Sequence, residues 1–96
     1  MRILILAACT WVMENYEQLR RSSGGAWTSC PVFVGNTEYP IEIRVAKGDG
    51  YINVRSACPS GQEVTAAERK MIRQIRVMLR KHGYRVLYAD VRGNAV

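Results

Sequence analysis

Residues 41–56 read IEIRVAKGDGYINVRS, and this stretch decides the fold. Apolar side chains alternate with polar ones on both sides of a central Lys-Gly-Asp-Gly segment, residues 47–50. Such alternation is typical of strands with one buried face, and glycine beside aspartate is typical of the turn that joins them. The sequence therefore predicts a β-hairpin. Four side chains share its outer face and are candidate binding residues: Arg44, Tyr51, Asn53 and Arg55.

Downstream of the hairpin, residues 65–82 predict one amphipathic helix. Thr65 and Glu68 match the capping box, in which each side chain satisfies a free main-chain N–H of the first turn. Gly83 follows the last turn and is suited to a left-handed cap. An apolar stripe at helical spacing is expected to face the core: Met71, Ile72, Ile75, Met78 and Leu79.

The opposite side of this helix is strongly basic. At about 100° per residue, four arginines fall within about 60° of one another, and two lysines flank them. These predicted binding residues are Arg69, Arg73, Arg76 and Arg80, with Lys70 and Lys81. Neighbouring like charges repel by roughly 0.2–0.5 kcal/mol per pair, so the pattern favours a ridge that binds an acidic partner. The alternative is a solvated helix whose arginine stems cover apolar surface.

The N-terminal 21 residues have two interpretations. We prefer a strand at 2–7 followed by a helix at 10–21, because the run Ile-Leu-Ile-Leu at 3–6 would make a helix apolar all round. In the alternative, one helix starts at the N-terminus and carries a stripe of buried residues: Ile5, Ala8, Cys9, Val12, Tyr16 and Leu19.

The remaining segments complete a single predicted domain, residues 1–96. Residues 22–40 are expected to be mostly loop with a short strand at 31–35, and residues 84–91 predict a last strand. The resulting β-α-β-β-α-β order indicates a ferredoxin-like α+β fold, with two helices on one face of a small antiparallel sheet. The alternative is α-β-β-β-α, as in double-stranded-RNA-binding domains. An uncovered sheet face would bind a ligand or be buried in a homodimer.

Composition narrows the class of partner and the compartment. The 96 residues hold 14 Lys and Arg against 8 Asp and Glu, a net charge of +6, which favours nucleic acid or an acidic protein. No apolar run reaches the roughly 18 residues of a membrane span, and the N-terminal run is short for a signal peptide, so neither membrane nor export is expected. Three cysteines without a Cys-x-x-Cys pair favour a reducing cytoplasm.

Chemistry-bearing motifs are sparse, so we expect no enzyme, cofactor or metal. Cys9, Cys30 and Cys58 lack local metal-ligand spacing, and an enzymatic interpretation would need Cys9 or Cys58 to meet His82 in space. Trp27 lies in a loop rich in glycine, serine and threonine, and is a candidate interface anchor.

Two functional hypotheses follow. The leading one is a small nucleic-acid-binding module whose arginine-rich helix contacts phosphates, which suit the planar guanidinium. The other is a protein-interaction or inhibitor module, of viral or mobile-element origin, that docks its basic helix on an acidic protein surface.

Overall fold

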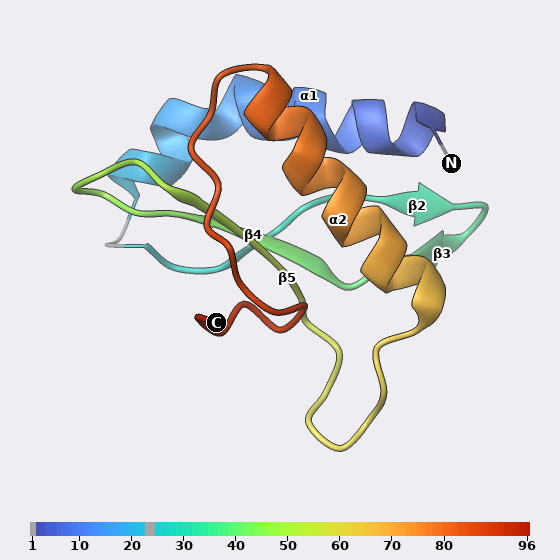
Figure 1. Ribbon diagram of the computed structural model, residues 1–96. Coiled ribbons are helices and arrows are strands. Elements are labelled where there is room, and N and C mark those ends of the chain that lie inside the picture. The colour runs from blue at the N-terminus through green and yellow to red at the C-terminus, as the bar shows by residue number, and fades with distance from the viewer. Residues whose placement is uncertain (1, 23–24) are drawn as a thin grey trace.

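The described part of the chain forms two helices, a three-stranded antiparallel sheet and a separate two-stranded sheet (Figure 1). The computed structural model describes residues 2–22 and 25–96. The elements are α1 (Arg2–Arg21), β1 (Thr28–Ser29), β2 (Phe33–Val34), β3 (Thr37–Glu38), β4 (Ile41–Val45), β5 (Ile52–Ser56) and α2 (Ala66–Lys81). The predicted α+β class is confirmed. The element order opens with a helix, as in the alternative to the ferredoxin-like order.

One continuous helix, α1, occupies the N-terminal region, so the predicted strand at residues 2–7 is wrong. Its buried side chains are spaced so that they lie along one side of the helix: Ile5, Ala8, Cys9, Val12 and Leu19. The apolar run at 3–6 does not prevent a helix, because the surplus apolar side chains lie on its outer side. There Ile3 is 82% and Leu6 51% exposed.

The predicted hairpin is confirmed as β4 and β5, with Ile43 opposite Val54. Strand β1 pairs with the other edge of β4, while β2 and β3 form a separate two-stranded sheet. The hairpin turn contacts α1, where the Tyr16 hydroxyl donates to the Gly50 carbonyl at 2.8 Å. Gly50 has φ +75°, and a Cβ there would lie 2.6 Å from that hydroxyl. Glycine is therefore required at this position.

Both helices cover the same face of the three-stranded sheet. Helix α1 packs against β4, and α2 packs against β5 and α1. The core between these layers consists mainly of Ile41, Ile43, Val45, Ile52, Val54, Met71, Ile72, Ile75 and Leu79. The predicted core stripe of α2 is thus confirmed, except that Met78 is only half-buried. Within the described residues, neither helix combines the length and apolar character needed to cross a bilayer.

Helix α2 begins after Thr65, as predicted, and the Thr65 hydroxyl accepts from the Glu68 main-chain N–H at 3.2 Å. The second half of the predicted capping box is wrong. The Glu68 carboxylate instead accepts from the Ser56 hydroxyl at 3.2 Å, in a buried position. Glu68 therefore joins the first turn of α2 to the end of β5.

The C-terminal segment, residues 84–96, returns along the free edge of β5 (Figure 1). It makes isolated bridges rather than the strand predicted at 84–91. Ile52 N donates to Arg85 O at 2.8 Å near one end, and Ser56 N donates to Val91 O at 2.7 Å near the other. Among the described residues, no main-chain hydrogen bond joins Val54, midway between them, to this segment. A side chain from α2 donates a hydrogen bond to the Val54 carbonyl instead.

Candidate functional site

The cations of α2 differ in what they contact. One flank contacts the C-terminal segment and the loop before α2, and holds Arg69, Arg76 and Arg80. The other lines a groove between α2 and α1, and holds Lys70, Arg73 and Lys81. Among the cations predicted to form one ridge, Arg76 and Arg80 therefore bind main-chain oxygens of the chain itself, while Lys70, Arg73 and Lys81 line the groove.

Arg76 is only 9% exposed, which corrects its predicted place on the open face of the helix. Its Nη2 donates to Val54 O at 2.5 Å and to Asp90 O at 2.8 Å, while Nη1 donates to Ala89 O at 2.8 Å. Burial lowers the pKa of Arg76, the charge of Arg80 lowers it further, and Asp90 raises it. The guanidinium thus joins β5 to the C-terminal segment.

Arg80 and Arg69 also reach main-chain oxygens. Arg80 lies 4.1 Å from the ring centroid of Tyr88, and its Nη2 donates to Val86 O at 3.3 Å. Arg69 remains exposed, although its Nε donates to Val64 O at 3.3 Å. Of these three arginines, Arg69 is exposed, Arg80 is half-buried and Arg76 is buried.

The groove on the other flank has basic walls and an apolar floor. It encloses about 550 Å³. Its described lining residues are Ile5 from α1, and Lys70, Arg73, Gln74, Val77, Met78 and Lys81 from α2. The groove therefore brings together residues that are distant in sequence, namely one from the apolar stripe of α1 and several from the outer side of α2.

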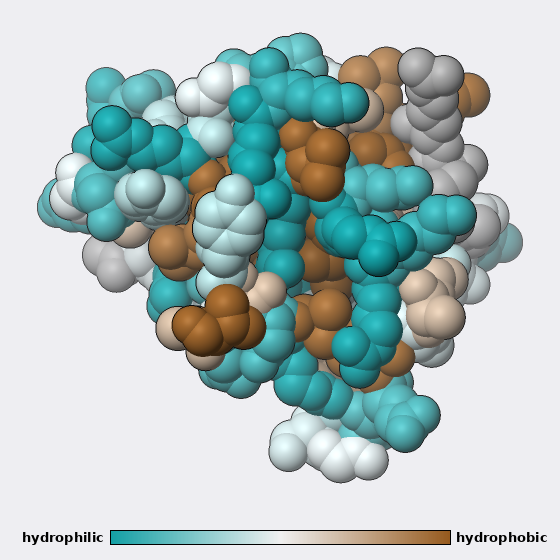
Figure 2. Space-filling model, in the orientation of Figure 1, coloured by the Kyte–Doolittle hydropathy of each residue, from teal (hydrophilic) through white to brown (hydrophobic). Residues whose placement is uncertain are grey.

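Apolar surface continues around this groove. Val77 is 43% exposed, and the first turns of α1, which supply Ile5, also carry the exposed Ile3 and Leu6. Figure 2 shows hydrophobic atoms between hydrophilic ones on the face that α2 occupies. Exposed apolar side chains that gather beside charged ones are typical of a protein-interaction site.

Within the described chain, the groove cations form no ion pair, and no Asp or Glu lines the groove. The ion pair that the described residues do form joins Arg55 to Glu42, on the sheet face that is opposite the helices. On α2 itself the one carboxylate, Glu68, is buried against Ser56. The charges of Lys70, Arg73 and Lys81 are thus available to an external acidic group.

The outer face of the hairpin is covered, which corrects the expected open sheet face. Trp27 packs against two guanidiniums, with its ring centroid 4.7 Å from Cζ of Arg44 and 3.9 Å from Cζ of Arg55. Asn53 is 2% exposed, and its Nδ2 donates to Gly93 O at 3.0 Å. Tyr51 remains half-buried near Arg85. The predicted second binding surface is largely an intramolecular contact.

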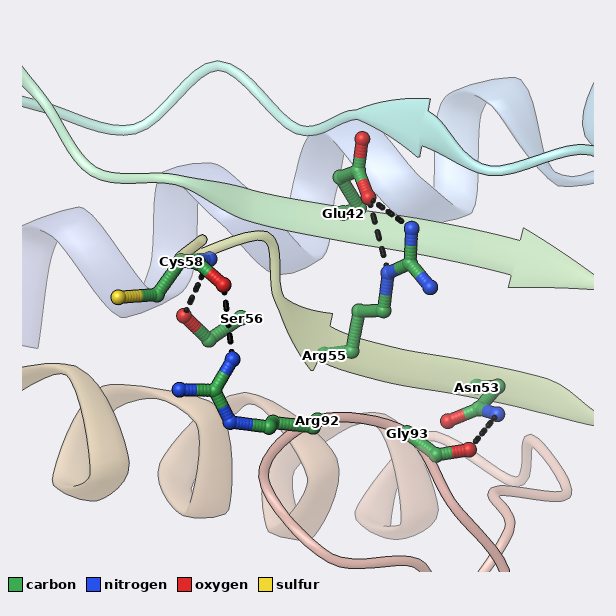
Figure 3. Close-up of polar contacts among 7 residues, drawn as sticks. All are labelled: Glu42, Asn53, Arg55, Ser56, Cys58, Arg92 and Gly93. Atoms are coloured by element: carbon green, nitrogen blue, oxygen red, sulfur yellow. Dashed lines mark hydrogen bonds and ion pairs between the residues drawn. The ribbon is translucent and has the colours of Figure 1, made fainter. Parts of the chain in front are cut away.

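Figure 3 shows how polar side chains tie this face together. Arg55 donates to Glu42 Oε1 from Nε at 2.9 Å and from Nη2 at 2.6 Å. Arg92, in the C-terminal segment, donates from Nη1 to Cys58 O at 2.8 Å. Arg55 therefore joins β5 to β4, and Arg92 holds the C-terminal segment to the loop after β5.

The three cysteines differ in burial. Cys9 and Cys30 are buried, and burial raises the pKa of Cys9 to about 11 and that of Cys30 to about 12. Cys58 is half-buried in the loop after β5, and His82 is exposed at the end of α2. Within residues 2–22 and 25–96, no three His, Cys, Asp or Glu side chains gather as metal ligands.

Comparison of the chain with protein-family models, curated proteins and solved structures finds no match. The groove between α1 and α2 is therefore interpreted from its own residues.

Proposed function

We propose that the protein is a docking module that binds an acidic protein surface in the groove between α1 and α2. One observation carries the proposal, namely that Lys70, Arg73 and Lys81 line a partly apolar groove and form no ion pair within the described chain. An acidic protein surface supplies carboxylates for the walls and apolar side chains for the floor. The three free cysteines agree with a cytoplasmic setting.

Nucleic acid is the second candidate, because Arg69, Lys70, Arg73 and Lys81 are all exposed on α2. Two features make it the weaker one. Arg76 is held by main-chain oxygens, and the apolar floor offers nothing to a phosphate. If four phosphates were neutralised, affinity for a 20-nucleotide RNA or DNA would fall about 100-fold between 50 and 200 mM salt.

A capture experiment separates these candidates. The bait is the wild type, a groove variant with Lys70, Arg73 and Lys81 changed to Gln, or a control variant with Arg21, Lys47 and Arg85 changed to Gln. Both variants lose three cations, and all the control positions are exposed and lie outside the groove lining. Lysate of the source cells is used with and without nuclease, and the captured proteins are quantified by mass spectrometry.

The proposal expects a protein that survives nuclease treatment, is retained by the control variant and is lost with the groove variant. Loss of every complex on nuclease treatment would favour the nucleic-acid candidate. Equal loss with both variants would indicate attraction by net charge alone and would count against a docking groove.

A further inference from the structure

We propose that the groove takes an amphipathic α-helix of the partner, with an apolar face on the floor and carboxylates along its edges. This inference rests on the proposed function and adds the form of the bound segment. The groove itself is formed by two helices, α1 and α2, that pack against each other. A third helix can lie in such a groove with its side chains between those of the other two.

The spacing of the groove residues indicates an elongated ligand. Lys70, Arg73, Val77 and Lys81 recur at intervals of three, four and four residues along one side of α2. At 1.5 Å per residue this stripe extends over roughly 16 Å, which is about three helical turns. A ligand that contacts the whole stripe must run along α2, with acidic groups near both ends and apolar groups between them.

The main chain around the groove favours a helix over an extended strand. A bound strand needs unpaired main-chain donors and acceptors at a sheet edge. The described lining residues belong to α1 and α2 and none belongs to a strand, so the lining offers no sheet edge to a bound strand. A helical ligand satisfies its own main chain and needs only side-chain contacts, which this groove provides.

The charge pattern defines the chemistry of that helix. Lys70 and Arg73 lie one turn apart toward the N-terminal end of α2, and Lys81 lies near its C-terminal end. Carboxylates at matching three- and four-residue intervals would meet them. Leucine, isoleucine or methionine side chains between those carboxylates would cover Ile5, Val77 and Met78.

The test is a charge swap with synthetic peptides. The probe is a fluorescein-labelled 18-residue peptide with Leu at helical spacing, Glu at the flanking positions and Ala elsewhere. One matched peptide replaces each Glu by Lys. Another keeps every Leu and Glu and replaces two of the Ala residues by Pro. Each is titrated by fluorescence anisotropy into the wild type, Lys70→Glu with Arg73→Glu, and a control carrying Arg21→Glu with Arg85→Glu at equal net charge.

The proposal expects the Glu peptide to bind the wild type and the control within about twofold, and the groove variant at least about tenfold more weakly. The Lys peptide should show the reverse preference. Methyl NMR signals of Ile5, Val77 and Met78 should shift on binding, which attraction by charge alone would not produce. Circular dichroism of both protein variants checks that they remain folded.

The remaining outcomes overturn the inference in distinguishable ways. Equal binding of the proline peptide would exclude a helical ligand but leave the acidic docking groove standing. A labelled 20-nucleotide RNA that binds through the groove while neither helical peptide binds would overturn both proposals. Groove-dependent self-association, measured by light scattering, would make a second copy of this chain the ligand. Absence of binding by any probe would also overturn the inference.

Discussion

The Arg76 guanidinium donates to the main-chain oxygen of Val54 at 2.5 Å, in the middle of the edge strand β5. It donates from the same Nη2 to Asp90 O and from Nη1 to Ala89 O, both in the C-terminal segment. A planar guanidinium can do this because its donors point in several directions within one plane. Arg76 thus joins two main-chain segments where they do not bond to each other.

Changing Arg76 to Met is expected to destabilise the protein by about 3 kcal/mol. The variant removes three hydrogen bonds and leaves acceptors in a buried place without donors. Urea denaturation followed by circular dichroism measures the loss, and hydrogen exchange should show faster exchange in residues 85–91. The matched control is Arg73→Met, an exposed position on the same helix, with an expected effect within about 0.5 kcal/mol. An equally small effect at Arg76 would contradict its bridging role.

Sequence periodicity was sufficient for the hairpin and α2, because each has a regular pattern and recognisable ends. It failed at residues 2–7, where an apolar run was taken to require burial on every side. In the folded chain Ile5 is buried while Ile3 and Leu6 are exposed. A helix that exposes some apolar side chains has the same apolar run as a buried strand. Periodicity therefore cannot distinguish the two structures.

The candidate site was predicted only in part. The basic residues of α2 were found, yet periodicity placed Arg76 and Arg73 on one face. Arg76 is buried and Arg73 is exposed, because the C-terminal segment packs on one flank of α2 and leaves the other open. That packing depends on contacts distant in sequence, as does the contribution of Ile5 to the groove. One signal for the groove is present in the sequence. Val77 is an apolar residue of α2 that lies outside the core stripe, which indicates an apolar patch on the outer side of the helix.

Changing Gly93 to Ala is expected to cost about 2–3 kcal/mol. Gly93 has φ +84°, and a Cβ there would lie 3.0 Å from Cη2 of Trp27 and 3.1 Å from Cβ of Arg55. Gly61→Ala is the matched control, since Gly61 has φ +90° but no atom within 4 Å of an added Cβ. Thermal unfolding of both variants separates backbone strain from crowding. Equal losses of stability would show that Trp27 moves aside freely.

Among the three thiols, only Cys58 is expected to react in the folded protein. At about pH 8, a pKa near 11 at Cys9 reduces the thiolate fraction about 100-fold relative to its ordinary value of 9.0. Cys30, with a pKa of about 12, should react still more slowly. Intact-mass analysis after iodoacetamide treatment should show one added group in the native protein, three in urea and none in native Cys58→Ser. Rapid labelling of Cys9 or Cys30 in the native protein would contradict their burial.

The C-terminal turn should loosen in acid because of Asp90. Its Oδ1 accepts from Asn94 N at 3.0 Å and from Arg92 N at 2.9 Å. The Asn94 hydrogen bond, followed by that of Arg92, lowers the pKa of Asp90 below its ordinary value of 3.8. A carboxyl whose pKa is lower in the folded state stabilises that state above the ordinary value, and this contribution is lost as pH falls through the folded pKa.

We therefore expect the amide NMR signals of Asn94 and Arg92 to titrate together with a midpoint below 3.8, as exchange of both amides accelerates. Asp90→Asn keeps an acceptor oxygen without the titrating charge, so it should abolish this transition. Glu63→Gln, an exposed change elsewhere, should leave it in place. A midpoint at or above 3.8, or a transition that persists in Asp90→Asn, would assign the acid sensitivity of the turn to another group.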